Sequence, residues 1–124
     1  FIYNIHKKKI KLGLVTSSHK DQLLNSSSDN FLNLFNIIIC GDEVKNNKPH
    51  PDPYLLAAKK LKLKTNQCIV IENAPVGIES AKNANMTCIA VCHTNKKKFL
   101  NKADYIFKNF NDIFSLDIIK KLIK

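Results

Sequence analysis

Short apolar runs alternate with longer segments of helical character along this 124-residue chain. Residues 12–15, 37–40, 68–71 and 87–92 are apolar and end in polar or turn-forming residues, which is typical of strands buried on both faces of a sheet. A further short run, 105–107, is expected to be an edge strand. Strands that alternate with helices at this spacing predict an α/β fold with a doubly wound, Rossmann-like parallel sheet.

The expected helices are marked by apolar spacing and by residues suited to helix ends. In the best-marked helix, Asp52 is expected to be the N-cap and Pro53 the first helical residue. A helix over 20–34 is expected to break at its serine run, and one over 76–84 to end at Asn85, since asparagine tolerates the left-handed conformation. The side chains predicted to face the core are Tyr54, Leu55, Ala58 and Leu61, and, in a closing helix over 115–123, Leu116, Ile119, Leu122 and Ile123.

Composition is that of an ordinary soluble domain, with 44% hydrophobic and 24% charged residues. The formal charge of +10 raises the possibility of nucleic-acid binding. We expect none, because the basic residues other than histidine are scattered lysines, with no arginine for bidentate contacts to bases or phosphates. No apolar run is long enough to cross a bilayer, so we expect a cytoplasmic protein without membrane contact. We also expect the complete protein to be a monomer.

Four cysteines, Cys40, Cys68, Cys88 and Cys92, are present without a C-x-x-C pair and without histidine at zinc-site spacing. Three of them lie in or at the end of predicted strands. We therefore expect small buried hydrophobic side chains rather than metal ligands or nucleophiles.

Polar residues follow three of the predicted strands. Thr16 begins a Thr-Ser-Ser turn after the first run, Lys48 lies in the loop after the second, and Glu72 and Asn73 close the third. Right-handed crossovers bring the carboxyl ends of parallel strands to one edge of the sheet, where α/β proteins bind ligands. Hydroxyl, ammonium and acid-amide groups at one edge suit a phosphoryl group with a magnesium ion.

Each of these features has a simpler interpretation when it is taken alone. Thr16 is equally suited to cap the helix that follows it, and a lone lysine such as Lys48 is commonly a solvated loop charge. The pair Glu72 and Asn73 is compatible with a helix start.

Three segments together resemble one family. Residues 12–18 (LGLVTSS), 48–54 (KPHPDPY) and 69–86 (IVIENAPVGIESAKNANM) resemble the second, third and fourth motifs of the haloacid dehalogenase superfamily of hydrolases, nearest to its β-phosphoglucomutase-like phosphatase branch. The resemblance implies that Thr16 hydrogen-bonds the transferring phosphoryl group, that Lys48 stabilises charge on phosphate and nucleophile, and that Glu72 and Asn73 serve Mg²⁺. The residues implied in binding the substrate phosphate are Thr16, Ser17, Ser18 and Lys48.

The sequence departs from the pattern of this family in two places. The fourth motif usually ends in Glu-Asp, whereas Asn73 follows Glu72 here, which gives a metal ligand with one formal charge less. The Asp-x-Asp motif that carries the family's nucleophile is absent. The resemblance therefore implies that residues 1–124 are the carboxyl-terminal portion of a core domain. The nucleophile, the first central strand and a cap domain would lie upstream, that strand between the one ending at Thr16 and the one ending at Glu72.

The function implied is a magnesium-dependent phosphatase that acts on a small phosphorylated metabolite through an aspartyl-phosphate, with residues 1–124 inactive alone. One alternative is a sugar phosphomutase of the same branch, in which Ser18, His19 and Lys20 lie where a distal phosphate would bind. Another is a non-catalytic phosphate-binding remnant.

Overall fold

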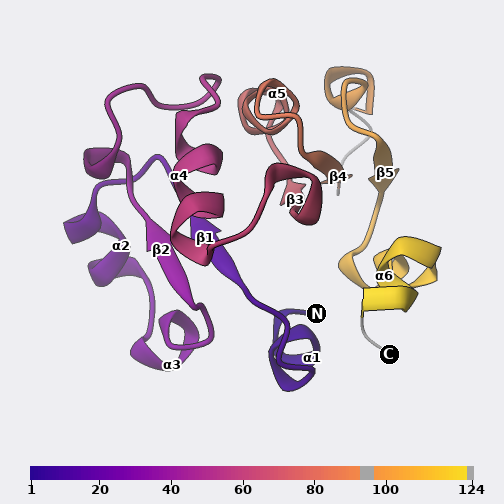
Figure 1. Cartoon of the computed structure of the whole chain (residues 1–124), viewed down its shortest axis with the longest axis horizontal. Helices are drawn as coiled ribbons and strands as arrows, with labels where there is room; N and C mark the ends of the chain where they lie inside the picture. Colours follow the sequence, from indigo (N-terminus) through magenta and orange to yellow (C-terminus); the bar gives the residue numbers. More distant parts are fainter. Residues whose placement is uncertain (93–96, 123–124) are drawn as a thin grey trace.

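The computed structural model describes residues 1–92 and 97–122, which form helices packed beside short parallel strands (Figure 1). None of the helices in these two ranges combines the length and apolar character needed to cross a membrane. The strands are β1 (Gly13–Val15), β2 (Ile37–Ile39), β3 (Ile69–Glu72), β4 (Thr87–Val91) and β5 (Tyr105–Phe107). The helices are α1 (Ile2–Lys7), α2 (Lys20–Ser26), α3 (Asp29–Leu32), α4 (Asp52–Leu61), α5 (Pro75–Asn83) and α6 (Asp117–Leu122). Short 3-10 turns are η1 (Gly41–Glu43), η2 (Thr65–Gln67), η3 (Lys97–Leu100) and η4 (Phe110–Ser115).

The strands form two parallel sheets. β1 pairs with β2, from Gly13 opposite Ile37 to Val15 opposite Ile39. The second sheet has the order β3-β4-β5, so β5 is an edge strand as predicted. In Figure 1, β1 and β2 lie on the left with α2 and α3, and the second sheet lies on the right with α5 and α6. The predicted α/β class with parallel strands is confirmed.

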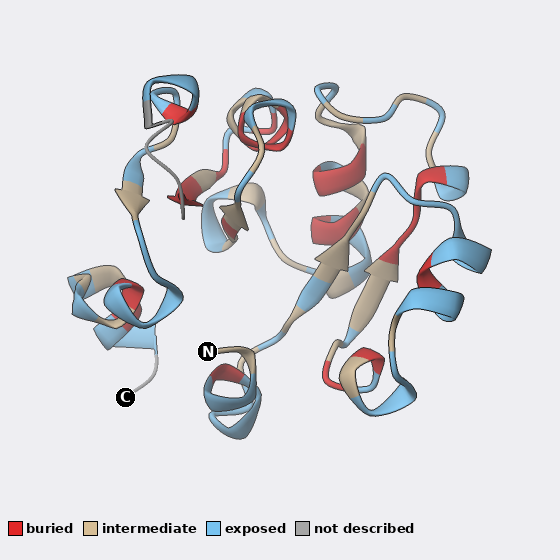
Figure 2. Cartoon of the chain, turned by 180° about the vertical axis from the view of Figure 1, so that it is seen from behind, coloured by how far each residue is buried: buried red, intermediate tan, exposed pale blue. Residues whose placement is uncertain are grey.

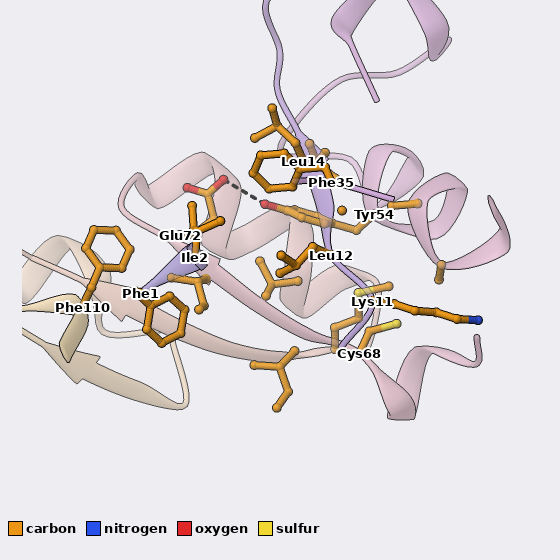
Figure 3. Close-up of a pocket in the computed structure, with 18 residues that line it drawn as sticks. Phe1, Ile2, Lys11, Leu12, Leu14, Phe35, Tyr54, Cys68, Glu72 and Phe110 are labelled. Atoms are coloured by element: carbon orange, nitrogen blue, oxygen red, sulfur yellow. Dashed lines mark hydrogen bonds between the residues drawn. The ribbon is translucent and has the colours of Figure 1, made fainter. Parts of the chain in front are cut away.

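A groove of about 330 Å³ lies between the two sheets. Within the described ranges, β1 pairs only with β2, and β3 pairs only with β4. Mainly apolar side chains of β1, β3 and α4 line the groove, and Figure 3 shows Leu14, Tyr54 and Glu72 among them. The inner edges of β1 and β3 therefore flank the place where the family resemblance implies a further strand.

β1 is less buried than the sequence predicts. A strand covered on both faces was expected over 12–15, but Gly13 is exposed and Leu14 and Val15 are only half-buried. Both half-buried side chains line the groove, so no strand covers that side of β1 in the described structure. The prediction of a fully buried first strand is wrong for this reason.

β4 separates two layers of the hydrophobic core. Cys88 and Ala90 pack in one cluster with side chains of α4 and α5. Ile89 and Val91 pack in a second cluster with Ile113 and a side chain of α6. Since successive side chains of a strand point to opposite faces, the second sheet is covered on both sides. Figure 2 shows the buried stretches in α4, α5 and β4.

α4 begins one residue earlier than predicted. Pro51, not Asp52, is the N-cap, and Asp52 is the first helical residue. Tyr54 and Ala58 are buried as predicted, but Leu55 is 40% exposed, so its inward assignment is wrong. Successive helical residues are about 100° apart around the axis, so Leu55 points away from the face that Tyr54 and Ala58 share.

The predicted break before α3 and the predicted end of α5 are confirmed, whereas one inward side chain of the closing helix is not. Ser28 caps α3 by accepting a hydrogen bond from the Phe31 amide, so the serine run does divide the segment into two helices. Asn85 has the left-handed φ of 59° that was expected after α5. In the closing helix Ile119 is buried, but Leu122 is 41% exposed and its inward assignment is wrong. Ile123 lies outside the described residues.

Three of the four cysteines are buried, as predicted. Cys40, Cys88 and Cys92 are buried and Cys68 is half-buried. Burial, with nearby carboxylates as a smaller cause, raises the pKa of the Cys88 thiol to about 12. A thiol with this pKa stays protonated at neutral pH and is a poor nucleophile.

Candidate active site

An ion pair between Lys48 and Glu72 joins the ends of the two sheets. Lys48 Nζ lies 2.6 Å from Glu72 Oε1, and each side chain is only 10% exposed. The same ammonium donates to the carbonyl oxygen of Val15 at 3.2 Å. Val15 is the last residue of β1 and Glu72 the last residue of β3, so Lys48 bridges the carboxyl ends of both strands across the groove.

Both carboxylate oxygens of Glu72 accept two hydrogen bonds. Oε1 accepts from Lys48 Nζ and from Tyr54 Oη at 2.9 Å. Oε2 accepts from the backbone amides of Asn73 and Ala74 at 3.0 and 3.2 Å. Burial would raise the pKa of Glu72, but the bonds from Lys48, Tyr54 and Ala74 outweigh it and bring the pKa below its ordinary value. Glu72 is therefore ionised at neutral pH.

Gly77 lets α5 pack directly against this carboxylate. A Cβ at position 77 would overlap the carboxyl group of Glu72. Gly77 lies in the early part of α5, and the N-cap residue Ala74 donates its amide to the same carboxylate. The beginning of α5 therefore fixes the position of Glu72.

Tyr54 is a site residue, although the sequence pattern predicts it only as a core side chain of α4. Its hydroxyl points to Glu72 in Figure 3, and its ring lies 5.2 Å from Lys48 Nζ. Burial, followed by the Glu72 carboxylate, raises the pKa of Tyr54, so the hydroxyl remains a donor. The sequence could have indicated this role on chemical grounds, because a tyrosine predicted to be buried needs a hydrogen-bond partner for its hydroxyl.

Thr16 directly follows Val15, whose carbonyl oxygen accepts a hydrogen bond from Lys48. The Thr16 amide donates to Ile39 O at 2.9 Å, and its Oγ1 accepts from the Ser18 amide at 3.1 Å. The threonine therefore closes a local turn and does not cap α2, whose N-cap residue is His19. Ser17 and Ser18 are exposed. Because the Val15 carbonyl belongs to the peptide bond that leads into Thr16, Lys48 and Thr16 are brought together.

The loop after β2 holds this turn from one side. The Gly41 amide donates to Ser18 O at 2.8 Å, and a Cβ at Gly41 would overlap the Ser17 carbonyl. A residue with a side chain at position 41 would thus push the turn away from β2. Glycine at position 41 therefore allows the loop after β2 to contact the Thr16 turn.

The described residues do not by themselves make a magnesium site. They contain no group of three or more His, Cys, Asp and Glu side chains placed to hold a metal ion. Asn73 is exposed at the rim, whereas both oxygens of Glu72 already accept hydrogen bonds. Magnesium prefers octahedral oxygen coordination, commonly with carboxylates. One amide oxygen falls short of that set, so further ligands would have to come from outside these residues.

Open α/β sheets bind ligands at the carboxyl ends of their parallel strands. Lys48 and Glu72 meet at these ends, so this edge is the candidate ligand-binding site. The chain matches the model of the haloacid dehalogenase-like hydrolase family over residues 1–91, and it belongs to that family. The resemblance found in the sequence is thereby confirmed.

Individual relatives are phosphatases and a phosphomutase. The chain is 30% identical over 113 residues to validoxylamine A 7'-phosphate phosphatase of Streptomyces hygroscopicus subsp. limoneus, covering 90% of this chain and 53% of that protein. It is 31% identical over 114 residues to phosphoglycolate phosphatase of Salmonella paratyphi A, covering 88% and 45%. The crystal structure of β-phosphoglucomutase from Clostridium difficile superposes with a TM-score of 0.76 at 31% identity, covering 98% and 52%. The chain thus spans about half the length of these proteins.

Proposed function

We propose that residues 1–124 are the carboxyl-terminal portion of the core domain of a magnesium-dependent phosphatase. In this proposal the complete protein hydrolyses a small phosphorylated metabolite through an aspartyl-phosphate, and the nucleophilic aspartate lies upstream of Phe1. The observation that carries the proposal is the ion pair of Lys48 and Glu72 at the strand ends, in which each side chain is only 10% exposed. Membership of the hydrolase family and the phosphatase activity named for two relatives support it.

The candidate site residues each have a proposed role in the reaction. The Lys48 ammonium offsets negative charge that builds up on the phosphoryl group and its nucleophile. Glu72 holds that ammonium in place, since its Oε1 accepts the bond from Lys48. Thr16 donates its hydroxyl to a phosphoryl oxygen, and the exposed hydroxyls of Ser17 and Ser18 extend the same phosphate-binding surface.

Magnesium is also part of the proposal. We assign Asn73 as one oxygen ligand, because its side chain is exposed next to Glu72. Glu72 contributes its negative charge beside the metal, and the remaining ligands come from outside the described residues.

A sugar phosphomutase is the second candidate. It is favoured by the similarity to a solved β-phosphoglucomutase at 31% identity. Ser18, His19 and Lys20 are exposed just after the Thr16 turn, where a second phosphate of the substrate would bind.

Product analysis with the complete protein tests the proposal and separates the two candidates. The protein is incubated with a panel of small sugar and organic-acid phosphates, with magnesium and with a chelator in its place. We expect release of inorganic phosphate that stops when magnesium is chelated. Conversion of a sugar 1-phosphate into the 6-phosphate without net phosphate release would favour the mutase. No reaction with any phosphate ester would contradict both.

A further inference from the structure

Two side chains of α5 hold the loop that carries Lys48. Ser80 Oγ donates to the carbonyl oxygen of His50, and Asn83 Nδ2 donates to the carbonyl oxygen of Pro49 at 3.1 Å. The two acceptors are the residues that directly follow Lys48. The loop is therefore attached to α5 at consecutive peptide groups next to the lysine.

The two donors differ in exposure but share one face of the helix. Ser80 and Asn83 are three residues apart, a spacing that places side chains on the same side of a helix. Ser80 is fully buried, with 0% of the residue exposed to solvent. A buried hydroxyl without a partner is costly, so the bond to His50 O is expected to persist. Asn83 is exposed and makes the second attachment at the surface.

The same helix also holds the partner of Lys48. Near its beginning, the Ala74 amide donates to Glu72 Oε2, and Gly77 allows close packing against the carboxylate. Further along, Ser80 and Asn83 hold the loop. α5 is thus a common support for both halves of the Lys48–Glu72 pair.

We propose that Ser80 and Asn83 are positioning residues that set the place of the Lys48 ammonium in the site. This inference rests on the proposed function, since it assumes that Lys48 acts on the phosphoryl group. They act through the backbone at positions 49 and 50, whose carbonyl oxygens accept their hydrogen bonds. If their role were only to stabilise the fold, their loss would lower stability without a specific effect on what Lys48 does.

Hydrogen exchange tests the attachment itself. In the complete protein, the backbone amides of residues 45–48 and of His50 should exchange faster in Ser80→Ala and in Asn83→Ala than in the wild type. The matched control is Glu79→Ala, which removes a side chain of the same helix whose carboxylate lies 3.8 Å from Lys102. Unchanged exchange of the loop in both variants would overturn the inference.

A double-mutant cycle tests whether the attachment acts through Lys48. We expect Ser80→Ala and Asn83→Ala to lower kcat by about ten-fold or more, because a small misplacement of a catalytic group is costly. KM should change by less than about two-fold if the loss is confined to the transition state. In the Lys48→Ala background the same substitutions should not lower kcat further, because the ammonium group that they position has been removed.

The outcomes separate this inference from the proposed function. If Lys48→Ala leaves kcat unchanged, the proposed function fails. If Lys48→Ala lowers kcat, but Ser80→Ala and Asn83→Ala lower kcat by the same factor with and without Lys48, the inference fails and the proposed function stands. Should Ser80→Ala not fold, Asn83→Ala carries the test alone, because its side chain is exposed.

Discussion

Lys48 and Glu72, 24 residues apart in the chain, meet at 2.6 Å between Nζ and Oε1. Lys48 lies in the loop after β2 and Glu72 is the last residue of β3, so the pair connects the two sheets at the carboxyl ends of their strands. Glu72 is held by Tyr54 and by the start of α5, which leaves it little freedom to move.

Gly77→Ala should destabilise the complete protein. Replacing glycine by alanine inside a helix ordinarily stabilises it by about 0.5–1 kcal/mol. Here the added Cβ would overlap the Glu72 carboxyl group, so we expect a loss of about 1–3 kcal/mol instead. Urea unfolding measures the difference, with Val76→Ala as a control because Val76 is 51% exposed. A stabilised Gly77→Ala variant would show that the close packing of α5 on Glu72 is absent in solution.

Glu72 should contribute stability that is lost in acid. Its pKa in the folded protein lies below the ordinary value, so its contribution is fully present above about pH 4.5 and falls as the pH drops through the lower, folded value. The measurement is the free energy of unfolding from pH 3 to 7 for wild type and Glu72→Gln. The difference between the two should shrink below about pH 4.5. A difference that is constant across the range would mean that Glu72 is not held as an ion.

Asn73→Asp should tighten magnesium binding if Asn73 is a ligand. The substitution adds a carboxylate to a site for a hard cation. Calorimetric titration of the complete protein with magnesium gives the dissociation constant directly, without reference to activity. Equal constants for the two forms would remove Asn73 from the metal site.

Residues 1–124 produced alone should be marginally stable or aggregate, and should show no phosphatase activity. The groove between β1 and β3 leaves apolar side chains and strand edges without a neighbour in the described structure, and such edges are costly and prone to self-association. Light scattering after size exclusion and an aryl phosphate assay with magnesium test both parts. Turnover above a mock preparation that Lys48→Ala abolishes would place the nucleophile within these residues.

Periodicity and topology were enough to predict much of the fold and the meeting of Lys48 with Glu72. Apolar runs located the strands, and the rule that parallel strands end at one edge brought the two residues together. The network around Glu72 was not predictable, because sequence spacing does not say that Tyr54 turns its hydroxyl towards the carboxylate. The exposure of Leu55 and the start of α4 at Asp52 depend on tertiary packing and on the backbone of Pro51. The half-burial of β1 depends on the groove beside it.

The most direct test of the central claim is the kcat of Lys48→Ala in the complete protein. Lys45→Ala is the matched control, since Lys45 is an exposed lysine of the same loop. Loss of one oriented charge that acts in the transition state should lower kcat by roughly 10²-fold or more, with a smaller change in KM. Lys45→Ala should behave as wild type. Unchanged kcat in Lys48→Ala, or an equal loss in both variants, would contradict the assignment of Lys48 to the active site.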